Sequence, residues 1–417
     1  MTINKLFSRR DLLKFASAGA GLAALGPLAE IATAQEGNGK FVVLVNLDGG
    51  NDSLNTVVPL NIGAYHDRRP SLGIDSPLDL TSGQGATSDY GLHPGLGGLQ
   101  TLYGEGGLAL IQKVGYPNAN RSHFTSKDIF HTGDTAAINA NNKTGWVARY
   151  ANLYNDHSLG CISVGYNAKA LQGSGTNLLQ VSKLSSFSYR ADSRYRGESA
   201  RRLEVARWIL ERQVASGNTL SVKKALQAGY ENMERIESIV ENYRSNVTYS
   251  SSRFGQSLED ISRLLQGGGL GTDIYYTGLK GFDTHRGQGS TSGRHSNLML
   301  DLNTGLDAFA RDMKAQGKWQ DCVIVVFSEF GRRNFENGSG GTDHGAGQTM
   351  MVTGGGIKGG IYGDALTYAD IRDESNLPME VDFRDVFSEV IAGHLGKDST
   401  PVFPDPNRLS GSALGFL

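Results

Sequence analysis

The chain has 417 residues, with 40 basic and 42 acidic side chains and a formal net charge of −2 at pH 7. This balance lacks the basic excess typical of nucleic-acid binding, and the length allows one large α/β domain. With only two cysteines, Cys161 and Cys322, a disulfide scaffold and a thiolate metal site are both excluded. Each cysteine opens a predicted strand, so we expect two separate buried thiols, with a single disulfide as the alternative.

Residues 1–34 have the pattern of an export signal. S-R-R-D-L-L-K at 8–14 is a twin-arginine element, an apolar Ala/Gly/Leu stretch follows at 15–28, and A-T-A at 32–34 is a cleavage pattern. The alternatives are a Sec signal with two chance arginines or a membrane anchor, but a membrane span needs roughly 20 apolar residues. We therefore expect a periplasmic or secreted mature chain from Gln35, with no integral membrane segment.

Short apolar runs, rich in β-branched or aromatic residues, alternate with helical patterns along the rest of the chain. Strands are predicted, in chain order, at 41–47, 108–114, 161–164, 272–279, 322–327 and 349–353. Helices are predicted at 122–132, 296–316 and 381–395. This alternation predicts a three-layer α/β/α domain, residues 35–417, around a central mostly parallel sheet of at least six strands.

The stretch 195–266 has a different character. Apolar residues recur there with a period near 3.6, which predicts amphipathic helices at 200–215, 222–246 and 257–265. Such helices either cover a sheet face or bind a partner. We therefore treat about 195–266 as a helical subregion of the same domain.

Acidic and imidazole side chains follow three predicted strands, where each apolar run stops. The segments are N-L-D-G-G-N-D at 46–52, G-F-D-T-H at 281–285 and S-E-F-G-R at 328–332, with T-D-H-G at 342–345 just beyond. Because the carboxyl ends of parallel strands share one edge of a sheet, these side chains are expected to converge. Their oxygen and nitrogen atoms suit a divalent metal. The candidate ligands are Asp48, Asp283, His285, Glu329 and His344.

Interpretations without a metal stay open for these residues. A buried Glu329 needs a cation, which Arg332 or Arg333 can supply as a structural ion pair. His344 lies in a Gly/Ser-rich loop and can simply be solvated. Asp48 can form an Asx turn, whereas the nearby Asn51 and Asp52 can instead add oxygen ligands.

Ser122 begins the helix predicted at 122–132 and follows Arg121. A helix N-terminus favours anions, so Ser122 is either a nucleophile for a phosphoryl or sulfuryl centre or a helix cap without chemistry. His123 and His131 are nearby and can be core or surface histidines. The chain has no G-x-S-x-G elbow, no P-loop and no G-x-G-x-x-G after a strand, which disfavours the usual serine hydrolases, NTPases and nucleotide dehydrogenases.

Several of these segments together resemble one bacterial family. They are the twin-arginine start, L-D-G-G-N-D-S-L-N-T-V-V-P, V-G-Y-P-N-A-N-R-S-H-F, L-K-G-F-D-T-H, F-S-E-F-G-R-R and N-G-S-G-G-T-D-H-G. The chain resembles the exported "domain of unknown function 1501" family, grouped with the alkaline phosphatase and sulfatase superfamily, from about residue 41 to 395. The resemblance implies an alkaline phosphatase-like α/β/α fold and no known substrate.

The resemblance also implies roles for individual residues. Asp48 is similar to the superfamily's first metal aspartate, and Ser122 to its nucleophile. Asp283 and His285 are similar to a D-x-x-x-H ligand pair, although the spacing here is shorter, and His344 is similar to the last ligand histidine. Phe330 stands where the superfamily carries a ligand, and Glu329 replaces its shorter acid, so the resemblance implies one metal or none in place of two. A formylglycine sulfatase is disfavoured, because no C-x-P-S-R element is present.

Two functions from different classes follow. The first is a metal-dependent hydrolase or transferase of phosphate or sulfate esters, in which Zn²⁺, Mn²⁺ or Ca²⁺ activates Ser122 or a water. Arg121, Arg332 or Arg333 would hold the anion in a charge-assisted fork. The second is a non-catalytic exported binding or assembly protein with a degenerate site on the same fold. The expected partner is an anionic ester, as a small molecule or a polysaccharide, and the oligomeric state stays open.

Overall fold

The computed structural model describes residues 39–136, 144–155, 159–173, 178–187, 197–212, 218–409, 411 and 413–417. The predicted signal at 1–34 and the expected new N-terminus at Gln35 lie outside these residues. Among the helices that are described, none is both long and apolar enough to cross a membrane.

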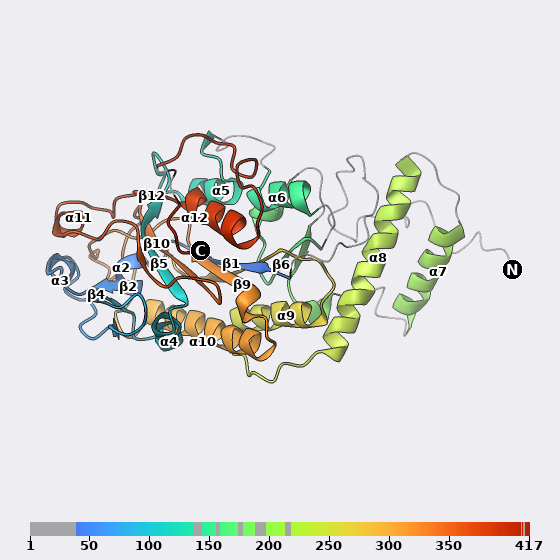
Figure 1. Ribbon diagram of the computed structural model, residues 1–417, viewed down its shortest axis with the longest axis horizontal. Coiled ribbons are helices and arrows are strands. Elements are labelled where there is room, and N and C mark those ends of the chain that lie inside the picture. The colour runs from blue at the N-terminus through green and yellow to red at the C-terminus, as the bar shows by residue number, and fades with distance from the viewer. Residues whose placement is uncertain are drawn as a thin grey trace.

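A nine-stranded sheet forms the centre of the molecule (Figure 1). Eight strands lie in the order β11 (Gly360–Tyr362), β5 (Leu108–Gly115), β10 (Gln348–Gly354), β9 (Cys322–Phe327), β1 (Phe41–Asp48), β8 (Ile274–Lys280), β6 (Cys161–Val164) and β7 (Leu179–Val181). The ninth, β12 (Val381–Asp382), pairs with β5. Only β10 among these strands is antiparallel to its neighbours. The prediction of a mostly parallel sheet with at least six strands is therefore confirmed.

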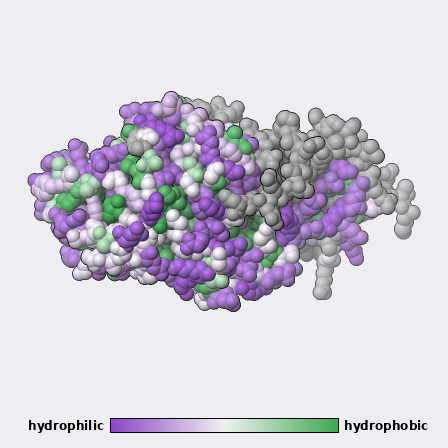
Figure 2. Space-filling model, in the orientation of Figure 1, coloured by the Kyte–Doolittle hydropathy of each residue, from purple (hydrophilic) through white to green (hydrophobic). Residues whose placement is uncertain are grey.

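Helices cover both faces of the sheet, which makes the predicted three-layer α/β/α architecture (Figure 1). Along β1, Phe41, Val43 and Val45 belong to the core layer with α4 (Gly97–Gly104), α9 (Arg253–Gly267) and α10 (Arg294–Ala315). The alternate residues, Val42 and Leu44, belong to the layer with α5 (His123–Thr132), α6 (Trp146–Tyr154) and α12 (Phe383–Glu389). Because both faces are buried, the strand is apolar throughout. In the view of Figure 2 the outer surface is mostly hydrophilic, as expected when the apolar side chains collect in these two layers.

The two cysteines are separate buried thiols, as expected. Cys322 lies in the core layer of α9 and α10, whereas Cys161 lies in the layer on the other face of the sheet. Burial raises the pKa of both thiols. They therefore act as small apolar side chains within the core.

The helical subregion contains α7 (Glu198–Arg212), α8 (Asn218–Asn242) and α9. Ser252 caps α9 by accepting a hydrogen bond from the N–H of Gly255, and Phe254, Leu258 and Ile261 of α9 are buried in the core. The apolar face of α9 therefore packs against the central sheet. In Figure 1, α8 crosses beside the main body and α7 lies on its far side. The division into a signal and one domain with a subregion at 195–266 stays a prediction.

The remaining elements are short. A three-stranded sheet has the order β2 (Val57–Pro59), β4 (Thr87–Leu92) and β3 (Leu78–Leu80). Three short helices are α2 (Ser53–Thr56), α3 (Ala64–Arg68) and α11 (Tyr368–Arg372). 3₁₀ turns lie at Lys169–Leu171, Leu184–Ser186 and Trp319–Asp321. The predicted helix at 381–395 is only partly correct, because its first two residues form β12 and its end is a π-helix at Val390–His394.

Candidate functional site

The carboxyl ends of β1, β8 and β9 meet at one edge of the sheet. Since β1 pairs in parallel with both other strands, their ends are adjacent. Asp48 ends β1, and the N–H of Gly49 donates to both carboxylate oxygens of Glu329, at 3.1 and 3.2 Å, just after β9. The carbonyl of Asp48 accepts from the N–H groups of Gly281 and Phe282, just after β8. The segments that carry the predicted ligands are thus joined by backbone N–H groups, which bond to the side chain of Glu329 and to the carbonyl of Asp48.

Three imidazole rings surround the carboxylate of Asp283. Its Oδ1 atom lies 3.1 Å from Nε2 of His285, 3.2 Å from Nε2 of His344 and 3.4 Å from Nε2 of His123. The Nε2 atoms of His285 and His344 are 2.9 Å apart. One ligand atom each from His123, Asp283 and His344 lies within 4.8 Å of the others, close enough to share a metal ion.

The other nitrogen of each ring faces an oxygen acceptor. Nδ1 of His123 lies 2.7 Å from Oε1 of Glu329, and Nδ1 of His285 lies 2.9 Å from Oδ1 of Asp343. Nδ1 of His344 lies 2.8 Å from the carbonyl oxygen of Arg121. Carbonyl and ionised carboxylate oxygens can only accept, so each of these three contacts is a hydrogen bond when Nδ1 carries a proton.

A neutral ring with its proton on Nδ1 presents a lone pair at Nε2. Burial lowers the pKa of His344, which favours its neutral form. Nε2 of His123 is buried and has no hydrogen-bond partner among the residues described. Each Nε2 atom also faces Oδ1 of Asp283, so a cation, either a proton or a metal ion, can bind between the rings and this carboxylate. The donor set therefore fits a metal ion.

Asp48 and Glu329 lie beside this cluster with a cation of their own. Nζ of Lys127 contacts Oδ1 of Asp48 and is 3.7 Å from Oε1 of Glu329. The hydroxyl of Tyr166 donates to the second oxygen of Asp48 at 3.0 Å. Burial opposes ionisation of Glu329, but the hydrogen bond from His123 and the charge of Lys127 hold its pKa below the usual value. Burial also opposes the charge on Lys127, but the hydrogen bond to Asp48 and the charge of Glu329 raise its pKa.

Arg332 is buried and joins the loops of the site. Its Nη2 atom lies 2.6 Å from Oδ1 of Asp283. Its Nε and Nη1 atoms donate to the carbonyls of Gly50 and Thr342, each at 2.8 Å. Burial opposes ionisation of Asp283, but the hydrogen bond and charge of Arg332 hold its pKa far below the usual value. The expectation that Arg332 pairs with Glu329 or grips an anionic ligand is wrong, because these contacts use its donors. The guanidinium of Arg333 lies over the ring of Phe335.

Two further predicted ligands lie elsewhere. Asp52 is buried and pairs with Arg69 at 2.6 Å, and the side-chain amide of Asn51 donates to Thr56 at 2.9 Å. The expectation that Asn51 and Asp52 add metal ligands is therefore wrong.

Phe330 is buried under the site, with its ring 4.8 Å from that of His123 and 4.9 Å from that of His344. It holds two imidazoles in place by packing.

Ser122 is the N-cap residue of α5, directly before His123, and its side chain makes no capping hydrogen bond. Its N–H donates to the side chain of Asn120 at 2.8 Å. The side chain of Arg121 is exposed, while its carbonyl oxygen contacts His344. The catalytic roles of Ser122 and Arg121 stay predictions.

The sequence reasoning did not assign His123, Lys127 or Asp343 to the site. One signal was present, because His123 and Lys127 are four residues apart and thus share one face of α5. Asp343, which supports the ring of His285, lies in the T-D-H-G segment beside the predicted ligand His344, so its acidic side chain was also a signal.

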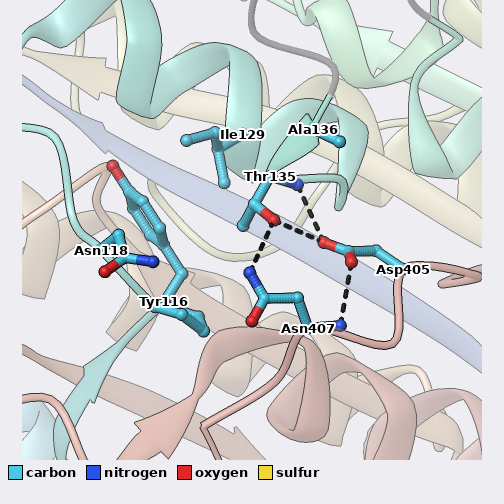
Figure 3. Close-up of a pocket in the computed structure, with 8 residues that line it drawn as sticks. Tyr116, Asn118, Ile129, Thr135, Ala136, Asp405 and Asn407 are labelled. Carbon is cyan, nitrogen blue, oxygen red and sulfur yellow. Dashed lines mark hydrogen bonds between the residues drawn. The ribbon is translucent and has the colours of Figure 1, made fainter.

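A separate cavity of about 290 Å³ lies near the other end of α5 and contains none of these residues (Figure 3). Asp405 in its wall accepts hydrogen bonds from the N–H and hydroxyl of Thr135, at 3.0 and 2.7 Å, and pairs with Arg384. Burial opposes ionisation of Asp405, but the hydrogen bonds from Thr135 lower its pKa to about 2. Asp405 therefore serves the local fold.

The family model "Protein of unknown function (DUF1501)" matches residues 93–402, so the chain belongs to this family. No curated protein matches the sequence. The C-terminal periplasmic domain of EcEptC from Escherichia coli, in complex with Zn, is similar with a TM-score of 0.40 and 10% identity over 93% of this chain and 92% of that chain. A protein in the alkaline phosphatase superfamily from Vibrio parahaemolyticus has a TM-score of 0.36 and 12% identity over 88% and 74%. The phosphonate monoester hydrolase of Agrobacterium radiobacter has a TM-score of 0.34 and 10% identity over 86% and 74%.

Proposed function

We propose that this chain is a metal-dependent hydrolase of phosphate or sulfate esters, exported by the twin-arginine route. His123, His285, His344 and Asp283 would hold the metal. The observation that carries the proposal is the convergence of three Nε2 atoms on Asp283 while each Nδ1 faces a fixed acceptor. Such outer acceptors are the usual support of metal-bound imidazoles, because they fix the tautomer and the ring orientation.

The donor set favours one metal among the three considered from the sequence. Three imidazole nitrogens and one carboxylate suit Zn²⁺, whereas Ca²⁺ takes six to eight oxygen ligands. Mn²⁺ prefers carboxylate, carbonyl and water ligands. We therefore propose Zn²⁺ held by His123 in addition to the predicted Asp283, His285 and His344, without Asp48 or Glu329.

The chain's own residues would divide the chemistry as follows. A bound zinc ion would supply a Lewis acid for the ester oxygen. Glu329 accepts the Nδ1 proton of His123 and so keeps the Nε2 lone pair of that ring free. Ser122 would be the nucleophile, since its hydroxyl is not used as a helix cap and the N-terminus of α5 favours an anion beside it. The exposed Arg121 would attract the anionic ester.

The first test is metal binding. Protein stripped with a chelator and reloaded with Zn²⁺ should retain the ion after dialysis. His344→Ala should lower the affinity by more than about 100-fold, since loss of an outer partner alone typically costs 10–100-fold. His66→Ala is the matched control, because its side chain is half exposed and lies near Asp75, outside the site. A wild-type chain that retains no Zn²⁺, Mn²⁺ or Ca²⁺ would refute the site.

The second test is hydrolysis of phosphate monoesters, phosphate diesters and sulfate esters by the metal-loaded protein. Ser122→Ala should keep the metal and lose turnover, whereas Ser126→Ala, on the same helix but bonded to Tyr116, should keep both. Bound metal without hydrolysis of any of these esters would favour the non-catalytic binding protein.

A further inference from the structure

The contacts of Asp48 and Glu329 bear on how many ions the site takes. Both residues follow strands that end at the site, and both have the charge of a metal ligand. Their oxygens, however, already have donors. Oδ1 of Asp48 contacts Nζ of Lys127, and Oδ2 accepts from Tyr166 at 3.0 Å. Oε1 of Glu329 faces His123 at 2.7 Å, and Oε2 accepts from the N–H of Gly49 at 3.2 Å.

We propose that the site takes a single divalent ion and that Lys127 occupies the position of a second cation. This inference rests on the proposed metal site. The ammonium group of Lys127 lies between two carboxylates from different strand ends, in contact with Asp48 and 3.7 Å from Glu329. Its side chain is only 26% exposed, so these carboxylates take the place of much of its hydration.

Cations of the chain already pair with most of the carboxylates of the cluster. Four carboxylates line it, those of Asp48, Asp283, Glu329 and Asp343. Lys127 contacts Asp48 and lies 3.7 Å from Glu329, and Arg332 pairs with Asp283. A second ion would have to displace Lys127.

Lys127 also has a link to the first ion's ligands. His123 and Lys127 lie one turn apart on α5, and both face Glu329. Glu329 in turn orients the ring of His123 through Nδ1. Lys127 is thus a positioning residue, because it lies 3.7 Å from the carboxylate of Glu329 that orients His123.

The test counts zinc ions by elemental analysis and titration of the full chain. The wild-type protein should hold one equivalent. Asp48→Asn should also hold one equivalent, with an affinity within about 10-fold of wild type, because Asp48 is not a ligand. Two equivalents in the wild type, or a loss of more than about 100-fold in Asp48→Asn, would overturn the inference while leaving a metal site in place.

Lys127→Ala gives the most direct comparison. It leaves Asp48 and Glu329 without their cation, so the variant should gain a second, weaker equivalent of zinc. Lys127→Arg keeps the charge and should stay at one, as should Lys169→Ala, whose exposed ammonium pairs with Asp128. A folded Lys127→Ala variant that holds only one zinc ion would overturn the inference. If this variant does not fold, the number of zinc ions in the wild type and the zinc affinity of Asp48→Asn test the inference instead. One ion without hydrolysis would refute only the proposed hydrolase, and no ion in the wild type would refute the proposed metal site itself.

Discussion

Asp312 on α10 binds several side chains of the helical subregion, so its loss should weaken the attachment of that subregion. Its buried carboxylate accepts hydrogen bonds from Tyr243 at 3.1 Å, Ser245 at 2.8 Å, Tyr249 at 2.9 Å and Ser262 at 2.7 Å. These donors come from the segment after α8 and from α9. One carboxylate therefore joins both to α10.

Asp312→Ala removes the acceptor that these donors share. Ser245 and Tyr249 are partly exposed and can bond to water, whereas Tyr243 and Ser262 are buried. Tyr243 and Ser262 also bond to each other at 3.1 Å, so one of the two can still donate to the other. A buried donor without a partner costs about 1–3 kcal/mol, so the one that remains gives a loss of about 2 kcal/mol in the free energy of unfolding. Asp312→Asn keeps one acceptor oxygen and should lose about half as much, roughly 1 kcal/mol.

Urea unfolding followed by circular dichroism measures both losses. Asp307→Asn is the matched control on the same helix, because the side chain of Asp307 is 39% exposed and pairs with Arg311, at 2.9 Å, one turn away. Exposed pairs of this kind contribute about 0.3–0.5 kcal/mol. If Asp312→Ala and Asp307→Asn were equally stable, the carboxylate of Asp312 would not hold the helices together.

Three more predictions follow from single features. Burial opposes ionisation of Asp312, but the hydroxyl donors, Ser262 first, lower its pKa. The ionised carboxylate therefore contributes stability above the unfolded pKa of about 3.9, and this contribution is lost as pH falls through the lower pKa of the folded state. In acid unfolding, the difference in stability between wild type and Asp312→Asn should close below about pH 4. Gly49 has φ +127°, and a Cβ there would lie 2.4 Å from the backbone nitrogen of Asp283. Gly49→Ala should therefore lower the free energy of unfolding in urea by at least about 2 kcal/mol, whereas Gly356→Ala, whose Cβ meets open space, should cost little. Equal losses in the two variants would contradict this reasoning. Arg9→Lys with Arg10→Lys should block export, and N-terminal sequencing of the periplasmic wild type should begin at Gln35; an intact Met1 or normal export of the double variant would refute the signal.

The strands were predictable because burial on both faces makes them apolar throughout. β1 and β9 have the predicted position to within one residue. The direction of β10 was not predictable, since a central strand buried on both faces has the same apolar pattern in either direction. Its antiparallel pairing with β5 and β9 depends on where the chain enters the sheet.

Because parallel strands end at one edge of a sheet, Asp48, Asp283 and Glu329 could be predicted to lie together there. This argument does not show what each carboxylate binds. Lys127, which contacts Asp48, is 79 residues away along the chain. Proximity in sequence makes Arg332 or Arg333 a candidate ion-pair partner of Glu329, yet the side chain of Arg332 reaches Asp283, 49 residues away. A carboxylate beside a metal and one beside an ammonium group have the same local sequence, so only the fold separates them.

His123 and His131 illustrate the same limit within one helix. Both lie on α5, and the sequence gives each the same choice between core and surface. Nε2 of His131 lies 3.1 Å from the hydroxyl of Tyr276 on β8, and burial lowers the pKa of this ring to about 4. His123, at the start of the same helix, instead meets the loops after β8 and β9, where Glu329 binds its Nδ1 and Asp283 faces its Nε2. The helix supplies two similar rings, and the partner opposite each ring makes one a core residue and the other a candidate ligand.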